Sequence, residues 1–387
     1  MVTGNGCHIH LIETQEEFEE LCSKWRLEKI LSIDTEFIRT NTFYPKLGLL
    51  QIADVNNCYL IDPLCISEWS PFAQLLTSGI EFCIHSCSED VNLLYTSISA
   101  IPREVFDSQL AAAFLGLGFS LSYQSLVKLL LGKEIPKDET RSDWLKRPLK
   151  DTQLQYAAND VSYLLALRER LLGQLKSKNV LAWFEEECVT QTNTAIEIEN
   201  KESWKNSYTT ISNAWRLDDL RLSQLREVCY WRELKARERN KPKNWIARDK
   251  DLFNIASIKQ DAGAFSRDDL EKITLSDRRF IMRYGDEIVN LLNNPLMQQI
   301  YLERSLLNFP LRPTLRKKLK ACQSVVSSLA EKLSVAPELL ARKRLLQNLV
   351  RDYESFGELR WEGNLSGWRK ELLEPEIKPL FGSAAIM

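Results

Sequence analysis

The chain has 387 residues, of which 44% are apolar and 27% are charged, a composition that excludes fibrous, low-complexity and largely disordered proteins. Its net charge of −2 conceals an asymmetry, because residues 1–200 carry 17 Lys and Arg against 28 Asp and Glu, and residues 201–387 carry 34 against 25. This division is typical of an acidic enzyme joined to a basic module that binds a polyanion, although domains also differ in surface charge without a functional reason.

The first 150 residues show strand patterns that alternate with helix patterns. Apolar residues at 30–33 lead into Asp34, and residues 49–53 and 58–61 flank Asn56 and Asn57, which predicts an antiparallel hairpin. Residues 81–84 predict a strand followed by a helix, and so do residues 105–106, where Asp107 is the expected helix N-cap. This alternation predicts a mixed α/β sheet.

After residue 150 the strand pattern largely disappears. Residues 156–175 have helical apolar spacing, residues 200–206 are polar enough for a linker, and from Leu217 onward the chain reads as helix and loop. An offset of 94 residues relates two of the helical segments, since residues 246–248 (IAR) correspond to residues 340–342 (LAR) and Leu225 to Leu319. The offset favours a duplicated helical module, although two amphipathic regions can also match by chance.

Three acidic segments carry side chains suited to catalysis. Asp34 and Glu36 lie two residues apart at the end of a predicted strand, Asp90 lies in the first turn of a predicted helix, and Tyr156 precedes Asp160 by one helical turn. Each segment alone has an ordinary explanation, namely solvated edge charges, a favourable helix dipole and a surface Tyr–Asp hydrogen bond. Together they supply an acidic cluster that an α/β fold can assemble.

Four carboxylates in one pocket repel one another unless they are protonated or neutralised by cations. Hard oxygen ligands of this kind suit Mg²⁺ or Mn²⁺. Two such ions about 3.5–4 Å apart can activate a water and stabilise the leaving oxygen of a phosphodiester. The residues alone therefore predict a metal-dependent phosphoryl-transfer site.

The same segments carry a family resemblance. SIDTEF (residues 32–37), HSCSED (85–90) and YAAND (156–160) resemble, in order and spacing, the three exonuclease motifs of the DEDD superfamily, and Tyr156 is typical of its tyrosine subclass. Nearly the whole chain is similar to the bacterial ribonuclease D family, through TEFIRTNTFYPKLGLLQIAD (35–54), TRSDWLKRPL (140–149), WRELKARERNKP (231–242) and SGWRKELL (366–373).

This resemblance implies an α/β catalytic domain over residues 1–205, with a ribonuclease H-like mixed sheet and flanking helices. Two all-α HRDC-type domains are implied at residues 211–294 and 300–375, the second of them degenerate. The implied reaction is 3′→5′ hydrolysis of RNA with two divalent metal ions, Mg²⁺ or Mn²⁺, releasing nucleoside 5′-monophosphates. The implied substrates are tRNA precursors with 3′ extensions.

The resemblance also implies a role for each residue of the acidic cluster. Asp34 would bridge both ions, Glu36 and Asp160 would hold the ion beside the attacking water, and Asp90 would act on the second ion through water. Tyr156 would orient the attacking water with its hydroxyl. These are the catalytic candidates, and the four carboxylates are the metal-ligand candidates.

Candidate RNA contacts are less specific. In the catalytic domain they are Arg39, Lys46, Arg141 and Trp144, although Trp144 fits a core position better; in the basic half they are Arg232, Lys235 and Arg239. Acidic neighbours interrupt the second group, so a solvated helix surface is the alternative there. If the basic half binds RNA, we expect a truncation near residue 200 to keep the metal site and lose affinity for structured RNA. His85 is expected to be a structural hydrogen-bonding residue rather than a base.

Two other functions remain open from the sequence. A proofreading-type DNA exonuclease shares the same carboxylates. A non-catalytic nucleic-acid-binding scaffold is the alternative of another class, but the complete carboxylate set argues against it, because such a scaffold has no reason to keep four mutually repelling charges. The nine cysteines are scattered with no Cys-x-x-Cys pair, which predicts reduced thiols, no disulfide and a cytoplasmic location. No apolar stretch approaches the roughly 20 residues of a membrane span, so we expect no membrane partner, and we expect a monomer.

Overall fold

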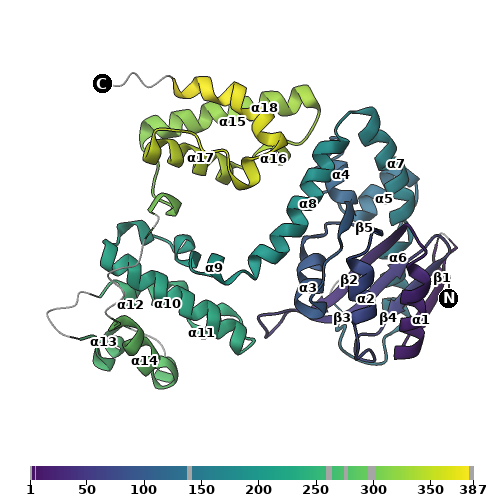
Figure 1. The fold of residues 1–387 in the computed structure, drawn as a ribbon, viewed down its shortest axis with the longest axis horizontal. Helices are drawn as coiled ribbons and strands as arrows, with labels where there is room; N and C mark the ends of the chain where they lie inside the picture. The colour runs from purple at the N-terminus through teal and green to yellow at the C-terminus, as the bar shows by residue number, and fades with distance from the viewer. Residues whose placement is uncertain are drawn as a thin grey trace.

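The computed structural model describes residues 2–4, 6–136, 142–258, 264–273, 278–294, 302 and 304–382. Six strands form one mixed sheet in the order β1-β4-β3-β2-β5-β6 (Figure 1). The strands are β1 (His8–Ile12), β2 (Ile30–Ile38), β3 (Lys46–Ala53), β4 (Asn57–Ile61), β5 (Glu81–Ile84) and β6 (Glu104–Asp107). Strand β3 is antiparallel to β2 and β4, and the other neighbouring pairs are parallel. The predicted hairpin and mixed sheet are confirmed.

Helices cover both faces of the sheet because successive strand residues point to opposite sides. On one face Leu50 and Ile52 of β3 pack in the apolar cluster of α1 (Gln15–Trp25), α2 (Ser70–Leu76) and α3 (Ser88–Ile98). On the other face Leu49 and Ala53 join a second cluster. That cluster includes α4 (Ser108–Phe114), α5 (Tyr123–Leu131), α6 (Asp151–Ser162), α7 (Leu164–Ser177) and α8 (Leu181–Ile198).

Two helical lobes follow (Figure 1). The first lobe contains α9 (Lys201–Trp204), α10 (Asp219–Glu238), α11 (Lys243–Ile246), α12 (Asp249–Ala256), α13 (Arg267–Ile273) and α14 (Arg278–Leu292). The second contains α15 (Pro313–Leu333), α16 (Pro337–Leu340), α17 (Lys343–Phe356) and α18 (Trp368–Ile377). Residues 201–204, which the sequence placed in a linker, form α9 instead.

The 94-residue offset recurs in the helices themselves. Helices α10, α11 and α12 begin at residues 219, 243 and 249, and α15, α16 and α17 begin at residues 313, 337 and 343. The short helices α11 and α16 both end at an extended alanine, Ala247 and Ala341, each with a φ of −159°. The chain therefore builds the same three-helix arrangement twice.

The second lobe is packed against the sheet-containing lobe. One continuous apolar cluster includes residues of α4, α7 and α8 together with residues of α15–α18. Trp368 stacks on Trp183 with ring centroids 5.5 Å apart, and Lys178 donates to the backbone carbonyl of Ser334 over 2.8 Å. Gly116 has a φ of +75°, and a Cβ there would lie 2.3 Å from that same carbonyl oxygen. The sheet-containing lobe therefore shares its apolar core with the second helical lobe and is not packed as an independent body.

The first lobe holds the loop between β2 and β3. The side-chain oxygen of Asn240 accepts hydrogen bonds from the backbone N–H groups of Phe43 (3.0 Å) and Tyr44 (2.9 Å). The Arg237 guanidinium lies 4.4 Å from the Phe43 ring centroid and 3.7 Å from that of Trp204. This loop directly follows β2, the strand that carries two of the candidate catalytic carboxylates. The first helical lobe therefore contacts a segment next to the candidate site.

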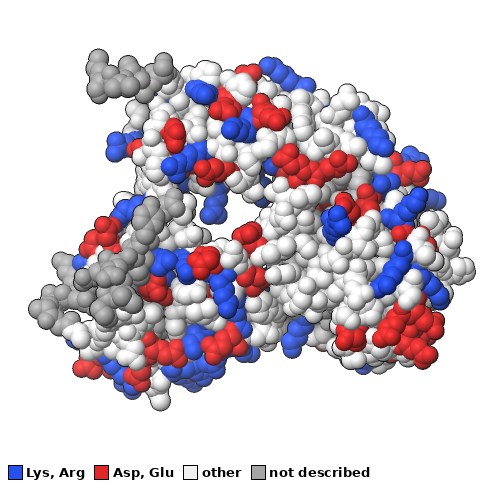
Figure 2. Space-filling view, in the orientation of Figure 1, with Lys and Arg blue, Asp and Glu red and all other residues white. Residues whose placement is uncertain are grey.

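The three lobes surround an opening in the molecule (Figure 2). In this view Lys and Arg side chains gather at the lower edge of the first helical lobe, over the region of α11 and α14. Within the part of the chain that the structure describes, no helix is both long and apolar enough to cross a membrane.

Candidate active site

Strand β2 presents two carboxylates on one face of the sheet. Asp34 and Glu36 alternate with Ile33 and Thr35, which point to the opposite face. Both acids keep partial exposure, whereas Ile33 is fully buried. The register of β2 against β3 shifts between Glu36 and Phe37, an irregularity that is frequent beside active sites because it redirects a side chain.

Asp90 reaches the same end of the sheet from the first turn of α3. Its position depends on Asp107, whose carboxylate accepts hydrogen bonds from the backbone N–H groups of Ser86 (3.0 Å) and Cys87 (2.9 Å). The same carboxylate caps α4 through the N–H of Gln109 at 2.8 Å. The Thr35 hydroxyl donates to the carboxylate of Asp90, which is 7% exposed, and so ties it to β2.

Helix α6 supplies the remaining two residues. Tyr156 and Asp160 lie one turn apart, and the tyrosine hydroxyl donates a hydrogen bond to Asp160, which is 9% exposed. Trp144, at 2% exposure, lies with its ring centroid 6.2 Å from that of Tyr156. Gly48 leaves room for Trp144, since a Cβ there would lie 2.6 Å from the tryptophan Cβ. Trp144 is therefore a core residue that supports Tyr156, and we do not retain it as an RNA contact.

Burial raises the pKa of every carboxyl group in the cluster, and repulsion between its members adds to this effect for Asp34 and Glu36. Burial, followed by repulsion from Asp90, Asp160 and Glu36, holds the pKa of Asp34 well above its usual value. Burial and the charges of Asp160 and Asp90 raise the pKa of Glu36 to about 8. The pKa values of Asp90 and Asp160 rise to about 7, chiefly because both groups are buried. Asp34 and Glu36 are thus close enough to Asp90 and Asp160 for their charges to interact, as the predicted acidic cluster requires.

The donor set fits hard divalent cations. Carboxylate oxygens are the ligands that Mg²⁺ and Mn²⁺ prefer, and a nearby cation would favour the charged forms that burial disfavours. As the side chains stand, no group of three described His, Cys, Asp or Glu residues converges tightly enough to hold an ion. The Thr35 hydroxyl holds the carboxylate of Asp90 in place. For the carboxylates to converge on one ion, other side chains must rotate, and the partly exposed Asp34 and Glu36 have the most room to do so.

The basic candidates on α10 are used inside the first helical lobe. Arg232 is 4% exposed, and its guanidinium pairs with Asp249 at 2.6 Å and donates to the Ala247 carbonyl at 3.1 Å. Lys235 pairs with Glu287 at 3.2 Å. Arg239 donates to the Tyr284 hydroxyl at 2.8 Å. Because these groups already have intramolecular partners, we do not retain them among the proposed RNA contacts.

The other predicted residues divide into three cases. Arg39 and Lys46 are exposed at the two ends of the β2–β3 loop, whereas Arg141 lies outside the described residues. Both ring nitrogens of His85 have partners, the Ser108 hydroxyl at 2.9 Å and the Leu121 carbonyl at 3.0 Å. The expectation that His85 is a structural residue is confirmed.

Three residues that support the site escaped the sequence interpretation. Thr35 holds Asp90, and Arg147 pairs with Asp62 and donates to the Gly48 carbonyl at 2.8 Å. Gln51 lies on β3 directly opposite Asp34 of β2 and is fully buried. Neither the nitrogen nor the oxygen of its side-chain amide has a hydrogen-bond partner. A sequence signal for Gln51 existed, because it is the one polar side chain between Leu47 and Ala53.

A mixed sheet of this ribonuclease H-like kind with an acidic cluster is typical of metal-dependent nucleases, and the comparisons narrow the class to 3′→5′ exonucleases. A family model described as "3'-5' exonuclease" matches residues 9–176, and one described as "HRDC domain" matches residues 221–292. Ribonuclease D of Pseudomonas paraeruginosa is 37% identical over 94% of this chain and 95% of its own length. The chain belongs to the ribonuclease D family and is a 3′→5′ exoribonuclease.

Solved structures agree with this assignment over nearly the full length. The crystal structure of Escherichia coli RNase D, described as an exoribonuclease involved in structured RNA processing, superimposes with a TM-score of 0.82 at 30% identity, covering 96% of this chain and 98% of that one. A protein from Bifidobacterium adolescentis shares the fold, with a TM-score of 0.62 at 20% identity and 97% coverage of both chains.

Proposed function

We propose that this protein hydrolyses RNA phosphodiesters one at a time from the 3′ end and releases nucleoside 5′-monophosphates with the help of two divalent metal ions. The observation that carries the proposal is the cluster of Asp34, Glu36, Asp90 and Asp160, of which the last two are buried and the first two partly exposed. Their raised pKa values mean that neutral pH leaves the cluster partly protonated unless cations compensate the charge.

The four carboxylates would hold the ions, which when bound would activate a water and stabilise the leaving oxygen. The chain's own groups supply the remaining steps. Tyr156, which packs beside Trp144, would orient the attacking water by accepting a hydrogen bond from it while its own hydroxyl donates to Asp160. Burial and the charge of Asp160 raise the pKa of Tyr156, which keeps the hydroxyl protonated. Thr35 keeps Asp90 aimed at the site.

Incubation of 5′-labelled RNA and DNA 12-mers of one sequence, with and without Mg²⁺, tests this reaction. We expect RNA to shorten in single-nucleotide steps only with the metal, with 5′-monophosphates as products. Asp34→Asn is the matched control, because it keeps the side-chain volume and removes the charge. Internal cleavage products, or shortening in excess chelator, would contradict the proposal.

The natural substrates we propose are tRNA precursors with 3′ extensions. The family resemblance supports this class, as does the description of the Escherichia coli relative as an enzyme of structured RNA processing. A precursor with a short 3′ trailer should be shortened to the edge of the acceptor stem, which is read on a sequencing gel. Shortening of an unstructured 12-mer together with an intact trailer would refute this substrate class.

We also propose three domains, an exonuclease domain over residues 1–205, an HRDC domain over 211–294 and a second HRDC-like domain over 300–375. The repetition of α10–α12 as α15–α17 supports the third domain. We propose that the protein is a cytoplasmic monomer, which sedimentation checks against a chain mass of 44.8 kDa and cell fractionation checks for location.

A further inference from the structure

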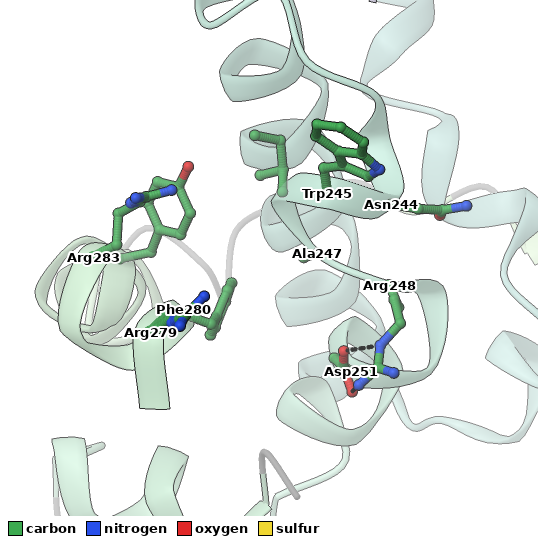
Figure 3. Close-up of a pocket in the computed structure, with 10 residues that line it drawn as sticks. Asn244, Trp245, Ala247, Arg248, Asp251, Arg279, Phe280 and Arg283 are labelled. Atoms are coloured by element: carbon green, nitrogen blue, oxygen red, sulfur yellow. Dashed lines mark hydrogen bonds and ion pairs between the residues drawn. The ribbon is translucent and has the colours of Figure 1, made fainter. Parts of the chain in front are cut away.

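The first helical lobe contains a pocket whose lining includes none of the four carboxylates of the cluster (Figure 3). We call it the α11–α14 pocket; it has a volume of about 370 Å³, within the range of ligand-binding sites. Figure 3 shows Arg279, Phe280 and Arg283 of α14 on one side, facing Trp245 and Arg248 across the pocket. Arg248 pairs with Asp251 at 2.9 Å. The lining contains three arginines and one acidic residue, which gives it a net charge of +2.

Trp245 is the most unusual residue of this lining. Its side chain is 60% exposed, although tryptophan is a residue that proteins usually bury. Lys241 lies 5.8 Å from its ring centroid, which leaves the indole beside a cation as well as beside the arginines. An exposed indole among cations is the combination by which proteins bind single-stranded nucleic acid, because bases stack on the ring and phosphates meet the charges.

Trp245 also lines a second pocket, which connects the first lobe to the exonuclease domain. This interdomain pocket has a volume of about 510 Å³ and includes Arg39, Thr40 and Asn92. Arg39 follows Glu36 by three residues, or about 10 Å of extended chain, and Asn92 follows Asp90 by two. The two pockets therefore meet at Trp245, and the lining of the second includes residues that follow Glu36 and Asp90 closely in the chain.

We propose that single-stranded RNA upstream of the 3′ end crosses Trp245, with one base stacked on the indole. Its phosphates contact Arg39 on the side of the active site and Arg283 on the side of the α11–α14 pocket. Both arginines are exposed, and neither forms an ion pair with a described residue. This inference rests on the proposed function, since it identifies how the same site receives a strand.

Binding without catalysis tests the path in the full-length protein. The affinity of a fluorescein-labelled 12-mer of oligoadenylate is measured by anisotropy in chelator. Loss of one stacked base predicts that Trp245→Ala weakens binding about 5- to 160-fold, and Trp245→Phe should retain most of the affinity. Arg283→Ala should reduce the slope of log K against log salt by about 0.7, the value for one single-strand phosphate contact.

Phe356→Ala is the matched control. This ring is also exposed and also carries an arginine, Arg360, at 3.4 Å from its centroid, but it belongs to the second lobe and lines neither pocket. It should bind RNA like the wild type. If Trp245→Ala binds the 12-mer within twofold of wild type, or if Phe356→Ala loses as much affinity, the path is refuted.

The length dependence of turnover adds a second test. With Mg²⁺, Trp245→Ala should lose more kcat/KM on a 12-mer than on a dinucleotide, because a dinucleotide ends before the indole. Equal losses on both lengths would refute the path while leaving the exonuclease activity established. A wild-type protein that binds RNA through Trp245 but never shortens it would support the path and refute the proposed function.

Discussion

The pH dependence of stability in the metal-free protein follows from the carboxylate cluster. A folded state that raises a carboxyl pKa binds more protons than the unfolded chain, so its stability falls as pH rises toward the raised pKa. The pKa of Glu36 rises from 4.5 to about 8, so its stability loss extends through neutral pH. The losses from Asp90 and Asp160 have the same sign and continue to about pH 7.

The window from pH 6.5 to 8 isolates this effect. Below pH 6.5 His85 has the opposite effect. Burial lowers its pKa, so its contribution to the unfolding free energy rises with pH while that of the carboxylates falls. Above pH 8, thiols titrate. Across these 1.5 pH units Glu36 alone costs about 2 kcal/mol, at 1.36 kcal/mol per unit. For a domain of roughly 150–250 residues, a loss of about 2 kcal/mol lowers Tm by about 4–8 °C.

Thermal unfolding in EDTA at pH 6.5 and 8 measures this loss. Mg²⁺ or Mn²⁺ should restore stability more at pH 8, because the cluster is more fully charged there; saturation at 100 times Kd adds about 2.7 kcal/mol. Asp34→Asn should flatten the pH dependence, whereas Glu13→Gln, which neutralises an exposed carboxylate outside the cluster, should leave it unchanged. Equal Tm values at both pH values, or a wild-type slope in Asp34→Asn, would refute the reasoning.

Three substitutions test individual residues. Asp34→Asn should abolish turnover and leave RNA affinity in chelator largely intact; more than a tenth of the wild-type rate would contradict a two-metal site. Tyr156→Phe should lower kcat about 10²–10³-fold through the loss of one orienting hydrogen bond, and full activity would remove it as the water-positioning group. Gln51→Met should raise the unfolding free energy by about 1–3 kcal/mol in urea titrations, because it removes a buried amide without partners; a loss of stability would show that the amide is satisfied.

The sequence predicted those parts of the fold that depend on local spacing. Strand β5 and the Asp107 cap of α4 were predicted because a short apolar run and a capping carboxylate act within a few residues of one another. The carboxylate cluster was predicted less directly, because local patterns gave only three separate acidic segments that an α/β fold could bring together. The predicted roles of its members were supplied by family resemblance, and their test is kinetic.

Long-range packing lay beyond local patterns. The sequence suggested that a truncation near residue 200 would leave the catalytic domain intact, yet Trp183 and Phe114 pack against Trp368 of the second helical lobe. Arg369 of the same lobe pairs with Glu187 of α8. Such a truncation would expose an apolar face and leave a buried carboxylate without its partner, so it tests stability before it tests RNA binding.

The charge asymmetry between the two halves illustrates the same limit. The excess of Lys and Arg after residue 200 suggested a phosphate-binding face on α10, but Arg232 and Arg237 are buried in ion pairs with Asp249 and Glu233. Such pairs orient helices. Opening one for a ligand would leave a buried charge without its partner, which is strongly unfavourable. Arg39 and Arg283 are different, because both are exposed and neither forms an ion pair with a described residue that a phosphate would have to replace. RNA affinity in the basic half should therefore depend on the surroundings of Trp245 rather than on the residues where positive charge is densest in the sequence.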